Sequence, residues 1–352
     1  MAYKVKIQDI ADKAGLSRNT VSKIFNGIYK GSKETREKVL QLAIDMKYKE
    51  FGQLQEQIVG KLLAPKSKNI LILSKGDVVN SNFFAHIVNE IQKRTEGEGY
   101  NLLLSNIREN DIKEKQLPSN IRSGVIDGIV CMELFDKPYI EKLLSMGIPT
   151  VFVEFYCDAW NIQGNFDVIM MNNEFYVYRM VDSLIKSGCK NIGYVGDYYH
   201  CRGFYERYMG YTKALISNNY TVDPRYCMTV TDGELYFNIP WICNQIKAMD
   251  RSPDAFVCAN DAIGIQVLKA LKQLEYSVPE EVQIISFDDI SEAATVSPSL
   301  TTVRIFREEL GRCAIDNLIA RIDNPNRKRQ IIYVDTEIVI RESTKKSVVW
   351  MY

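Results

Sequence analysis

The sequence predicts a small all-α domain at the N-terminus, followed by an α/β body of two doubly wound lobes. Two patterns indicate this fold class. Apolar residues recur at helical spacing within the first 50 residues, and beyond residue 68 short apolar runs alternate with amphipathic segments. The chain of 352 residues is also too long for one small helical module, and it fits a small domain joined to one large or two medium domains.

Two short helices are expected in the stretch IADKAGLSRNTVSKIFNG, which begins at residue 10. Gly15 can adopt the positive φ that ends the first helix, and the hydroxyl of Ser17 can cap the second. Because only about three residues turn the corner, the helices must cross steeply, as in a helix-turn-helix motif. A third helix is expected after Ser32, with Glu34 in its first turn, and it closes a small core.

The polar face of the second helix carries side chains that can read DNA bases. Arg18, Asn19 and Lys23 project together from its first turns. Arg can bind both acceptors of guanine, Asn can pair with adenine, and Lys can reach guanine or phosphate. The first 50 residues hold 11 Lys and Arg against 6 Asp and Glu, whereas the other 302 hold 33 against 38. These features favour DNA binding, although a short basic helical hairpin can also be a solvated cap on a larger fold.

Composition argues against several other classes of protein. No apolar run approaches the ~20 residues of a membrane span, and the first residues lack the apolar core of a signal peptide, so a cytoplasmic location is expected. Eight scattered cysteines without a CxxC pair indicate buried, reduced thiols. With only His86 and His200 in the chain, we expect no metal site, no cofactor and no enzyme activity.

The apolar runs of the body are expected to be strands of parallel sheets. Amphipathic segments such as FFAHIVNEIQKRTEGEG separate them, and strands that alternate with helices imply right-handed crossovers. There are too many strands for one compact sheet, which is why two lobes are expected. The runs are ILIL at 70, NLLLS at 101, DGIV at 127, PTVFV at 149, DVIMM at 167, NIGYV at 191, DAFVC at 254 and VQIISF at 282.

Polar residues that follow these strands are candidates for a binding site, because ligands of open α/β sheets lie beyond the carboxyl ends of the strands. Asn260 and Asp261 follow one strand, and Asp288 and Asp289 follow another. Asp261 is expected to cap the helix after it, and Asp289 could do likewise. Several aromatic rings lie near other strand ends, although in a chain with 20 Tyr and 14 Phe most rings belong to the core. They are Phe83, Phe84, Phe155, Tyr156 and Trp160.

Two stretches of the N-terminal segment, IQDIADKAGLSRNTVSKIFNG and SKETREKVLQLAIDMKY, match a known pattern in residue types and in spacing. They resemble the DNA-binding module of the lactose-repressor (LacI/GalR) family of bacterial transcription regulators. By this resemblance Arg18, Asn19 and Lys23 occupy base-contacting positions. Residues that contact backbone phosphates are implied to be Thr20, Ser22 and Asn26. A homodimer on a near-palindromic operator is expected, since one small module offers few base contacts.

The resemblance continues through the body, from SNFFAHIVNEIQKRTEGEGYNLLLSN to TEIVIREST. It implies a domain resembling periplasmic sugar-binding proteins, in which two α/β lobes linked by three crossovers close on a small molecule. The implied boundaries are 1–50 for the helix-turn-helix domain, 51–67 for a linker, 68–163 with 293–324 for the first lobe, and 164–292 with 325–345 for the second.

The resemblance also selects side chains for the cleft between the lobes. Arg207, Asn260 and Asp288 match positions that contact the ligand, and Phe83 and Phe84 lie where a cleft wall is implied. A sugar or sugar derivative is the effector that the family implies. The function implied is a ligand-responsive transcription regulator, in particular a repressor. The alternative is a solute-binding protein of the periplasmic sugar-binding type, against which the basic N-terminal domain argues.

The segment after Tyr48 departs from the family pattern. Family members carry a Pro-Asn pair there and a short hinge helix that ends in Ala-Arg-Ser-Leu and wedges leucine into the minor groove. This chain reads KEFGQLQEQIVGKLLAPKSK, without the Pro-Asn pair or the Arg, and it is several residues longer. Leu54, Ile58 and Leu62 recur every four residues, which favours a helix. The sequence leaves open whether this segment contacts DNA, a second subunit or the body of the protein.

Overall fold

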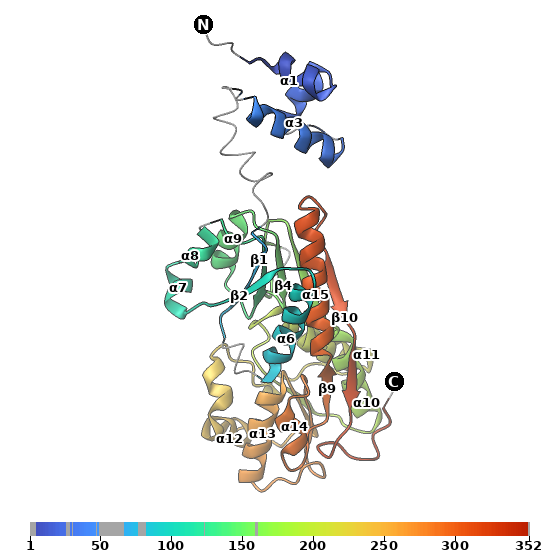
Figure 1. Ribbon diagram of the computed structural model, residues 1–352. Helices are drawn as coiled ribbons and strands as arrows, with labels where there is room; N and C mark the ends of the chain where they lie inside the picture. Colours follow the sequence, from blue (N-terminus) through green and yellow to red (C-terminus); the bar gives the residue numbers. More distant parts are fainter. Residues whose placement is uncertain are drawn as a thin grey trace. The chain divides into compact units, whose positions relative to one another are not determined.

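The computed structural model of the chain comprises two compact units, Met1–Ser67 and Lys68–Tyr352, which are described separately (Figure 1). The structure describes residues 5–25, 29, 31–46, 48, 67–76, 82–122, 124–158 and 161–350. The expected hinge segment, Asn26 and Trp160 lie outside these residues. No helix of the described ranges is long and apolar enough to cross a membrane.

The N-terminal unit is a three-helix domain with α1 over Ile7–Ala14, α2 over Arg18–Phe25 and α3 over Lys33–Asp45. Gly15 ends α1 at a φ of 71°. The Ser17 hydroxyl accepts the backbone N–H of Thr20 at 3.1 Å, and the Ser32 hydroxyl caps α3 in the same way. The expected helix ends and caps are therefore confirmed. The domain's core consists of Ile10, Ala11, Ala14, Val21, Ile24, Phe25, Val39, Leu40, Ala43 and Tyr48.

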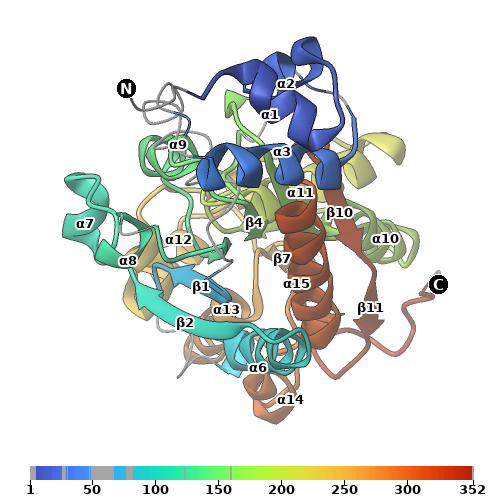
Figure 2. The same cartoon turned by 45° about the horizontal axis from the view of Figure 1, so that its top comes forward.

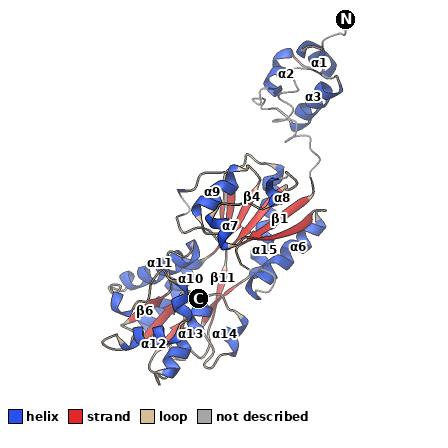
Figure 3. Ribbon diagram, turned by 90° about the vertical axis from the view of Figure 1, so that its left-hand side faces the viewer, coloured by secondary structure: helices blue, strands red, loops and turns tan. Residues whose placement is uncertain are grey.

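The first sheet of the body has six parallel strands in the order β10-β5-β4-β3-β1-β2. Its strands are β1 Asn69–Ser74, β2 Asn101–Asn106, β3 Gly128–Met132, β4 Thr150–Val153, β5 Phe166–Met171 and β10 Ile331–Val334. The helices beside it are α6 Asn82–Gly97, α7 Glu109–Lys113, α8 Ser119–Arg122, α9 Lys137–Ser145 and α15 Arg307–Asp323. Figure 3 shows α7, α8 and α9 on one side of the sheet, with α6 and α15 on the other, and Figure 2 shows α15 beside α6. We call this layer structure the first lobe.

The second sheet has parallel strands in the order β6-β7-β8, which are Ile192–Val195, Ala255–Cys258 and Gln283–Ile285. Strand β9 (Thr302–Ile305) continues it through the pairings of Ile285 with Thr301 and of Asp288 with Arg304. β9 also pairs antiparallel with β11 (Thr336–Val339). The helices of this second lobe are α10 Asn173–Lys186, α11 Arg202–Ser217, α12 Ile239–Lys247, α13 Asp261–Gln273 and α14 Ser291–Thr295, with short 3-10 turns at Pro224–Tyr226 and Gly233–Phe237.

The apolar runs of the sequence are all strands, but the expected lobe boundaries are wrong. β5 and β10, expected in the second lobe, extend the first sheet, and β9, expected in the first lobe, belongs with the second. The chain therefore crosses between the lobes at Asn172, Phe306 and Asp335.

A buried ion pair helps to hold β5 in the first lobe. The guanidinium of Arg321 on α15 donates to the Asp167 carboxylate of β5, with Nε and Oδ2 2.9 Å apart, and both side chains are almost fully buried. A pair buried this deeply is costly to break, since either charge would be left without compensation. The sequence pattern alone could not reveal this pairing, because its two residues are 154 positions apart.

Candidate functional site

The outer face of α2 presents a row of polar side chains with no partner among the described residues. Arg18, Asn19 and Lys23 are exposed, while Val21 and Ile24 of the same helix are fully buried in the small core. Helical spacing thus places the three candidate base-reading residues on the face opposite the core. Their long or amide side chains leave donors and acceptors free for base edges in a major groove.

Two of the residues predicted to contact phosphates are less exposed than the candidate base-reading residues. Thr20 is partly buried, and its hydroxyl lies 2.9 Å from that of Ser17, so it belongs to the cap of α2. Ser22 is also partly buried. A helix N-terminus with free backbone N–H groups favours a nearby phosphate even without these hydroxyls. Asn26 lies outside the described residues.

In the second lobe, the structure brings Arg207 and Asp288 together. Arg207 lies on α11 and is 3% exposed, with its Nη1 3.2 Å from Oδ1 of Asp288. Its Nε donates to Oδ1 of Asn173 at 3.0 Å, and Nη1 donates to the Ala259 carbonyl at 2.7 Å. The guanidinium also lies 3.9 Å from the ring centre of Phe287. Burial raises the pKa of the Asp288 carboxyl, and the Arg207 charge opposes this rise.

Arg307 connects Asp288 with the aromatic pair of the first lobe. Its Nη2 donates to the carbonyls of Asp288 and Asp289, at 2.6 and 2.8 Å, and its guanidinium lies 5.0 Å from the ring centre of Phe83. Phe83 and Phe84 meet edge to face at 4.9 Å near the start of α6. We call the region bounded by these aromatic rings and the Arg207–Asp288 pair the interlobe site.

The helix cap that was expected from Asp261 is provided by its neighbour Asn260. Asn260, not Asp261, caps α13, because its Oδ1 accepts the Ile263 N–H at 3.0 Å. Asp261 is the first residue of the helix and is fully buried, where it accepts the Ile290 N–H and the Thr302 hydroxyl. Burial raises the pKa of Asp261 to about 7. The prediction of Asp261 as a cap was wrong, since the extended backbone at Asn260 places the capping oxygen one residue earlier.

The other candidate residues at strand ends belong to the core or to structural ion pairs. The Phe155 ring is fully buried and packs edge to face on Phe152, with ring centres 4.7 Å apart. Tyr156 is partly buried against the same cluster. Asp289 is held by Arg304 and Arg341, which lower its pKa against the effect of burial.

Comparison with known proteins supplies the family. Residues 6–50 match the family described as bacterial regulatory proteins, lacI family, and residues 181–344 match the periplasmic binding protein-like domain. The chain belongs to the LacI family. It is 27% identical over 346 residues to the HTH-type transcriptional repressor PurR of Histophilus somni (strain 2336), covering 96% of this chain and 98% of that protein.

Solved structures with the same fold include LacI-family members bound to ligands. A transcriptional regulator CelR–cellobiose complex matches with a TM-score of 0.70 and 21% identity, covering 97% of this chain and 100% of that one. The Lac repressor dimer bound to operator and the anti-inducer ONPF matches with a TM-score of 0.65 and 19% identity, covering 97% and 99%. These likenesses confirm the helix-turn-helix domain and the two-lobed body.

Two acids of this LacI-family protein were missed by the sequence analysis. Glu133 and Glu154 directly follow the neighbouring strands β3 and β4, and both have positive φ values, 53° and 67°. Burial raises the pKa of both carboxyls, that of Glu154 to about 7. The rule that drew attention to Asn260 and Asp288, a polar residue where an apolar run ends, would have found them as well.

Glu154 joins the lobes directly. Its Oε1 accepts the backbone N–H of Gly203, in the first turn of α11, at 3.0 Å. The neighbouring Arg202 N–H donates to the Phe155 carbonyl at 2.9 Å. A carboxylate of the first lobe thus caps a helix of the second, where Cys201 provides no side-chain cap. A Cβ at Gly203 would lie 2.2 Å from Oε2 of Glu154, so a larger residue there would require this carboxylate to move.

Proposed function

We propose that this LacI-family transcription regulator is a homodimeric repressor whose affinity for operator DNA is set by a small molecule at the interlobe site. The observation that carries the proposal is the exposed row of Arg18, Asn19 and Lys23 on a helix-turn-helix. Similarity to a protein named as a transcriptional repressor supports repression of transcription over activation. Dimerisation is proposed because two recognition helices on half-sites about 34 Å apart multiply both affinity and specificity. Action on chromosomal DNA implies a cytoplasmic protein.

The proposed roles on DNA follow from side-chain chemistry. Arg18, Asn19 and Lys23 read base edges, and Thr20, Ser22 and Asn26 contact backbone phosphates. The second set has short hydroxyl or amide side chains, which donate hydrogen bonds to phosphate oxygens without distinguishing bases. We assign no catalytic step and no cofactor to the protein.

The effector is proposed to be a sugar or a sugar derivative. Asp288 offers hydrogen-bond acceptors, while the Asn260 carboxamide nitrogen has no hydrogen-bond partner among the described residues. Such groups, with Arg207, can bind several hydroxyls of one molecule. Phe83 and Phe84 supply apolar faces for stacking. A solved relative in complex with cellobiose is consistent with this class.

A mobility-shift assay with the DNA upstream of the protein's own gene tests DNA recognition. The full-length protein should shift this fragment and resist competition by scrambled DNA of equal length. Equal competition by both DNAs would contradict sequence-specific binding. A thermal-shift screen of the same protein against sugars and nucleobases then identifies the effector, and a hit among the nucleobases alone would contradict the proposed sugar class.

A further inference from the structure

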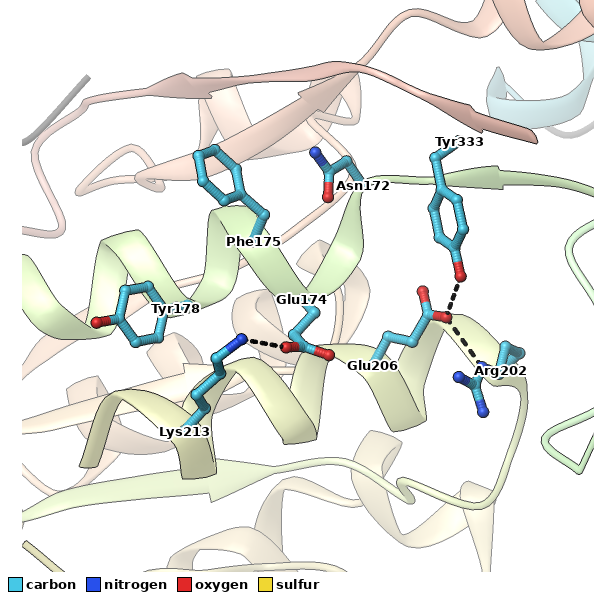
Figure 4. A pocket seen from close by; sticks show the side chains of 8 residues that line it. All are labelled: Asn172, Glu174, Phe175, Tyr178, Arg202, Glu206, Lys213 and Tyr333. Atoms are coloured by element: carbon cyan, nitrogen blue, oxygen red, sulfur yellow. Dashed lines mark hydrogen bonds and ion pairs between the residues drawn. The ribbon is translucent and has the colours of Figure 1, made fainter. Parts of the chain in front are cut away.

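We propose that the protein has a second small-molecule site, at a pocket between α10, α11 and β10, which binds a zwitterion with an aromatic or large apolar side chain. This pocket has a volume of about 580 Å³ (Figure 4). Among the residues that line it are Phe175 and Tyr178 of α10, Arg202, Glu206 and Lys213 of α11, and Tyr333 of β10. We call it the hinge pocket, because Asn172, at one crossing between the lobes, lines it, and Tyr333 lies two residues before another crossing, at Asp335. Its size falls in the range of about 300–1,000 Å³ typical of ligand sites.

The charged groups of the hinge pocket are balanced and only partly engaged. Glu174 binds Nζ of Lys213 through Oε1 at 2.9 Å, and its Oε2 has no partner among the described residues. Arg202 donates through Nε to Glu206 at 2.9 Å, while its two terminal nitrogens make no hydrogen bond within the described ranges. The pocket thus offers both an open carboxylate oxygen and an open guanidinium edge. A ligand that carries an ammonium and a carboxylate complements both.

Exposed aromatic rings define the rest of the ligand. Phe175 is 45% exposed, Tyr333 is 50% exposed, and both rings line the pocket. Figure 4 shows both rings on the side of the pocket away from α11. Such rings stack on another aromatic ring or on an aliphatic chain. An α-amino acid with an aromatic or large aliphatic side chain combines this body with the two charges.

The hinge pocket is separate from the interlobe site, but one buried side chain contacts both. Nδ2 of Asn173 donates to Oε2 of Glu206 at 3.2 Å, and Oδ1 of Asn173 accepts from Nε of Arg207 at 3.0 Å. The Tyr333 hydroxyl donates to Glu206 at 2.8 Å, so a strand of the first sheet and a helix of the second lobe meet there. A ligand in the hinge pocket therefore lies beside contacts between the two lobes. The Asn173 side chain links this pocket to Arg207 of the interlobe site.

Calorimetric titration of L-phenylalanine into the full-length protein tests the proposal. We expect saturable binding with one site per chain. Phe175→Ala should weaken it at least tenfold through lost stacking, and Glu174→Gln at least tenfold through loss of the ammonium partner. Both side chains are partly exposed, so the variants should fold, which circular dichroism verifies. Phenylacetate and phenethylamine, which each lack one charge, should bind at least tenfold more weakly than L-phenylalanine.

Matched controls separate the hinge pocket from other surfaces. Phe237→Ala removes an exposed ring elsewhere in the second lobe and should leave the affinity for L-phenylalanine unchanged. No binding of L-phenylalanine, L-tryptophan or L-leucine at millimolar concentration would overturn the proposal. Unchanged binding in folded Phe175→Ala and Glu174→Gln would do the same. Loss of binding in Asp288→Asn, with binding retained in Glu174→Gln, would place the amino acid at the interlobe site instead.

Discussion

Arg207 is held from several sides by the protein itself. Asn173, the Ala259 carbonyl and Asp288 each contact its guanidinium, and the Phe287 ring lies against its face. A side chain fixed in this way loses little conformational freedom when a ligand binds, so more of the interaction energy appears as affinity. Its charge is buried but compensated, which is the condition under which buried ions are tolerated.

At the same scale, Arg18→Ala should reduce base preference at one operator position. Loss of a bidentate contact to guanine costs about 1–3 kcal/mol for the preferred base and little for the others. Fluorescence anisotropy with a set of single-base operator variants measures this. Lys6→Ala, at the exposed end of α1, is the control and should weaken specific and scrambled DNA equally. An unchanged ratio of specific to scrambled binding in Arg18→Ala would mean that another face of α2 meets the bases.

Asp288→Asn should weaken binding of the effector found by the thermal-shift screen. Loss of a buried, charged hydrogen-bond partner costs about 2–5 kcal/mol in affinity. Calorimetric titration of that effector measures the loss. Glu280→Gln, which alters an exposed carboxylate of the same lobe, should bind as the unaltered protein does. Equal affinities in all three proteins would remove Asp288 from the effector site.

At the scale of elements, the end of β4 and the start of α11 depend on one another. Glu154 leaves β4 with a left-handed backbone and accepts a hydrogen bond from the first turn of α11. The helix dipole favours a negative charge at this position, whereas burial favours the protonated acid. The raised pKa of Glu154 shows that burial dominates.

The pH dependence of stability should therefore change in Glu154→Gln. The pKa of Glu154 rises from 4.5 to about 7 on folding, so the acid contributes stability that is present below pH 4.5 and is lost as the pH rises through 7. Glutamine resembles the protonated acid at every pH. We expect the variant to be more stable than the unaltered protein at pH 8 and similar to it near pH 4.5, as measured by urea denaturation.

A stability difference that is constant between pH 4.5 and pH 8 would contradict the raised pKa of Glu154. Asp261, whose pKa is also raised to about 7, titrates in both proteins and cancels in the comparison. Glu234→Gln, which alters an exposed glutamate of the second lobe, should show no such pH-dependent difference.

At the scale of the whole molecule, the body is built so that its lobes share chain and contacts. Three crossings join them, and contacts such as Glu154 to Gly203 and Tyr333 to Glu206 link residues of one sheet to helices of the other lobe. A ligand can alter DNA affinity only if it prefers one placement of the lobes, because equal affinity for both placements shifts nothing. The interlobe site and the hinge pocket both lie at such contacts.

Effector and operator should therefore be coupled with equal strength in both directions. We expect saturating effector to change operator affinity by about 5- to 150-fold, and saturating operator to change effector affinity by the same factor. Anisotropy titrations with and without effector, paired with calorimetry with and without operator, measure the two factors. An operator affinity that does not respond to saturating effector would contradict regulation through this site.

The sequence predicted features that depend on near neighbours. The caps of α2 and α3, the end of α1 at Gly15 and the strands of the body follow from residues a few positions apart. Asp288, predicted from its place at a strand end, and Arg207, implied by the family resemblance, lie 3.2 Å apart in the structure. Glu133 and Glu154 also directly follow strands and fit the same pattern.

The amino-acid sequence by itself determined the two kinds of domain, the elements in each and the family, because periodicity, capping and turn chemistry are local signals. Only the tertiary structure decided which sheet each strand joins and which side chain takes which role. The apolar sequence of β5 suits a buried strand in either sheet. Its place in the first sheet depends on packing and on the distant Arg321–Asp167 pair. Asn260 caps α13 in place of Asp261 because of backbone angles that no spacing reveals. Contacts between residues far apart in the chain form only when the whole body packs, so a pattern of neighbours does not contain them.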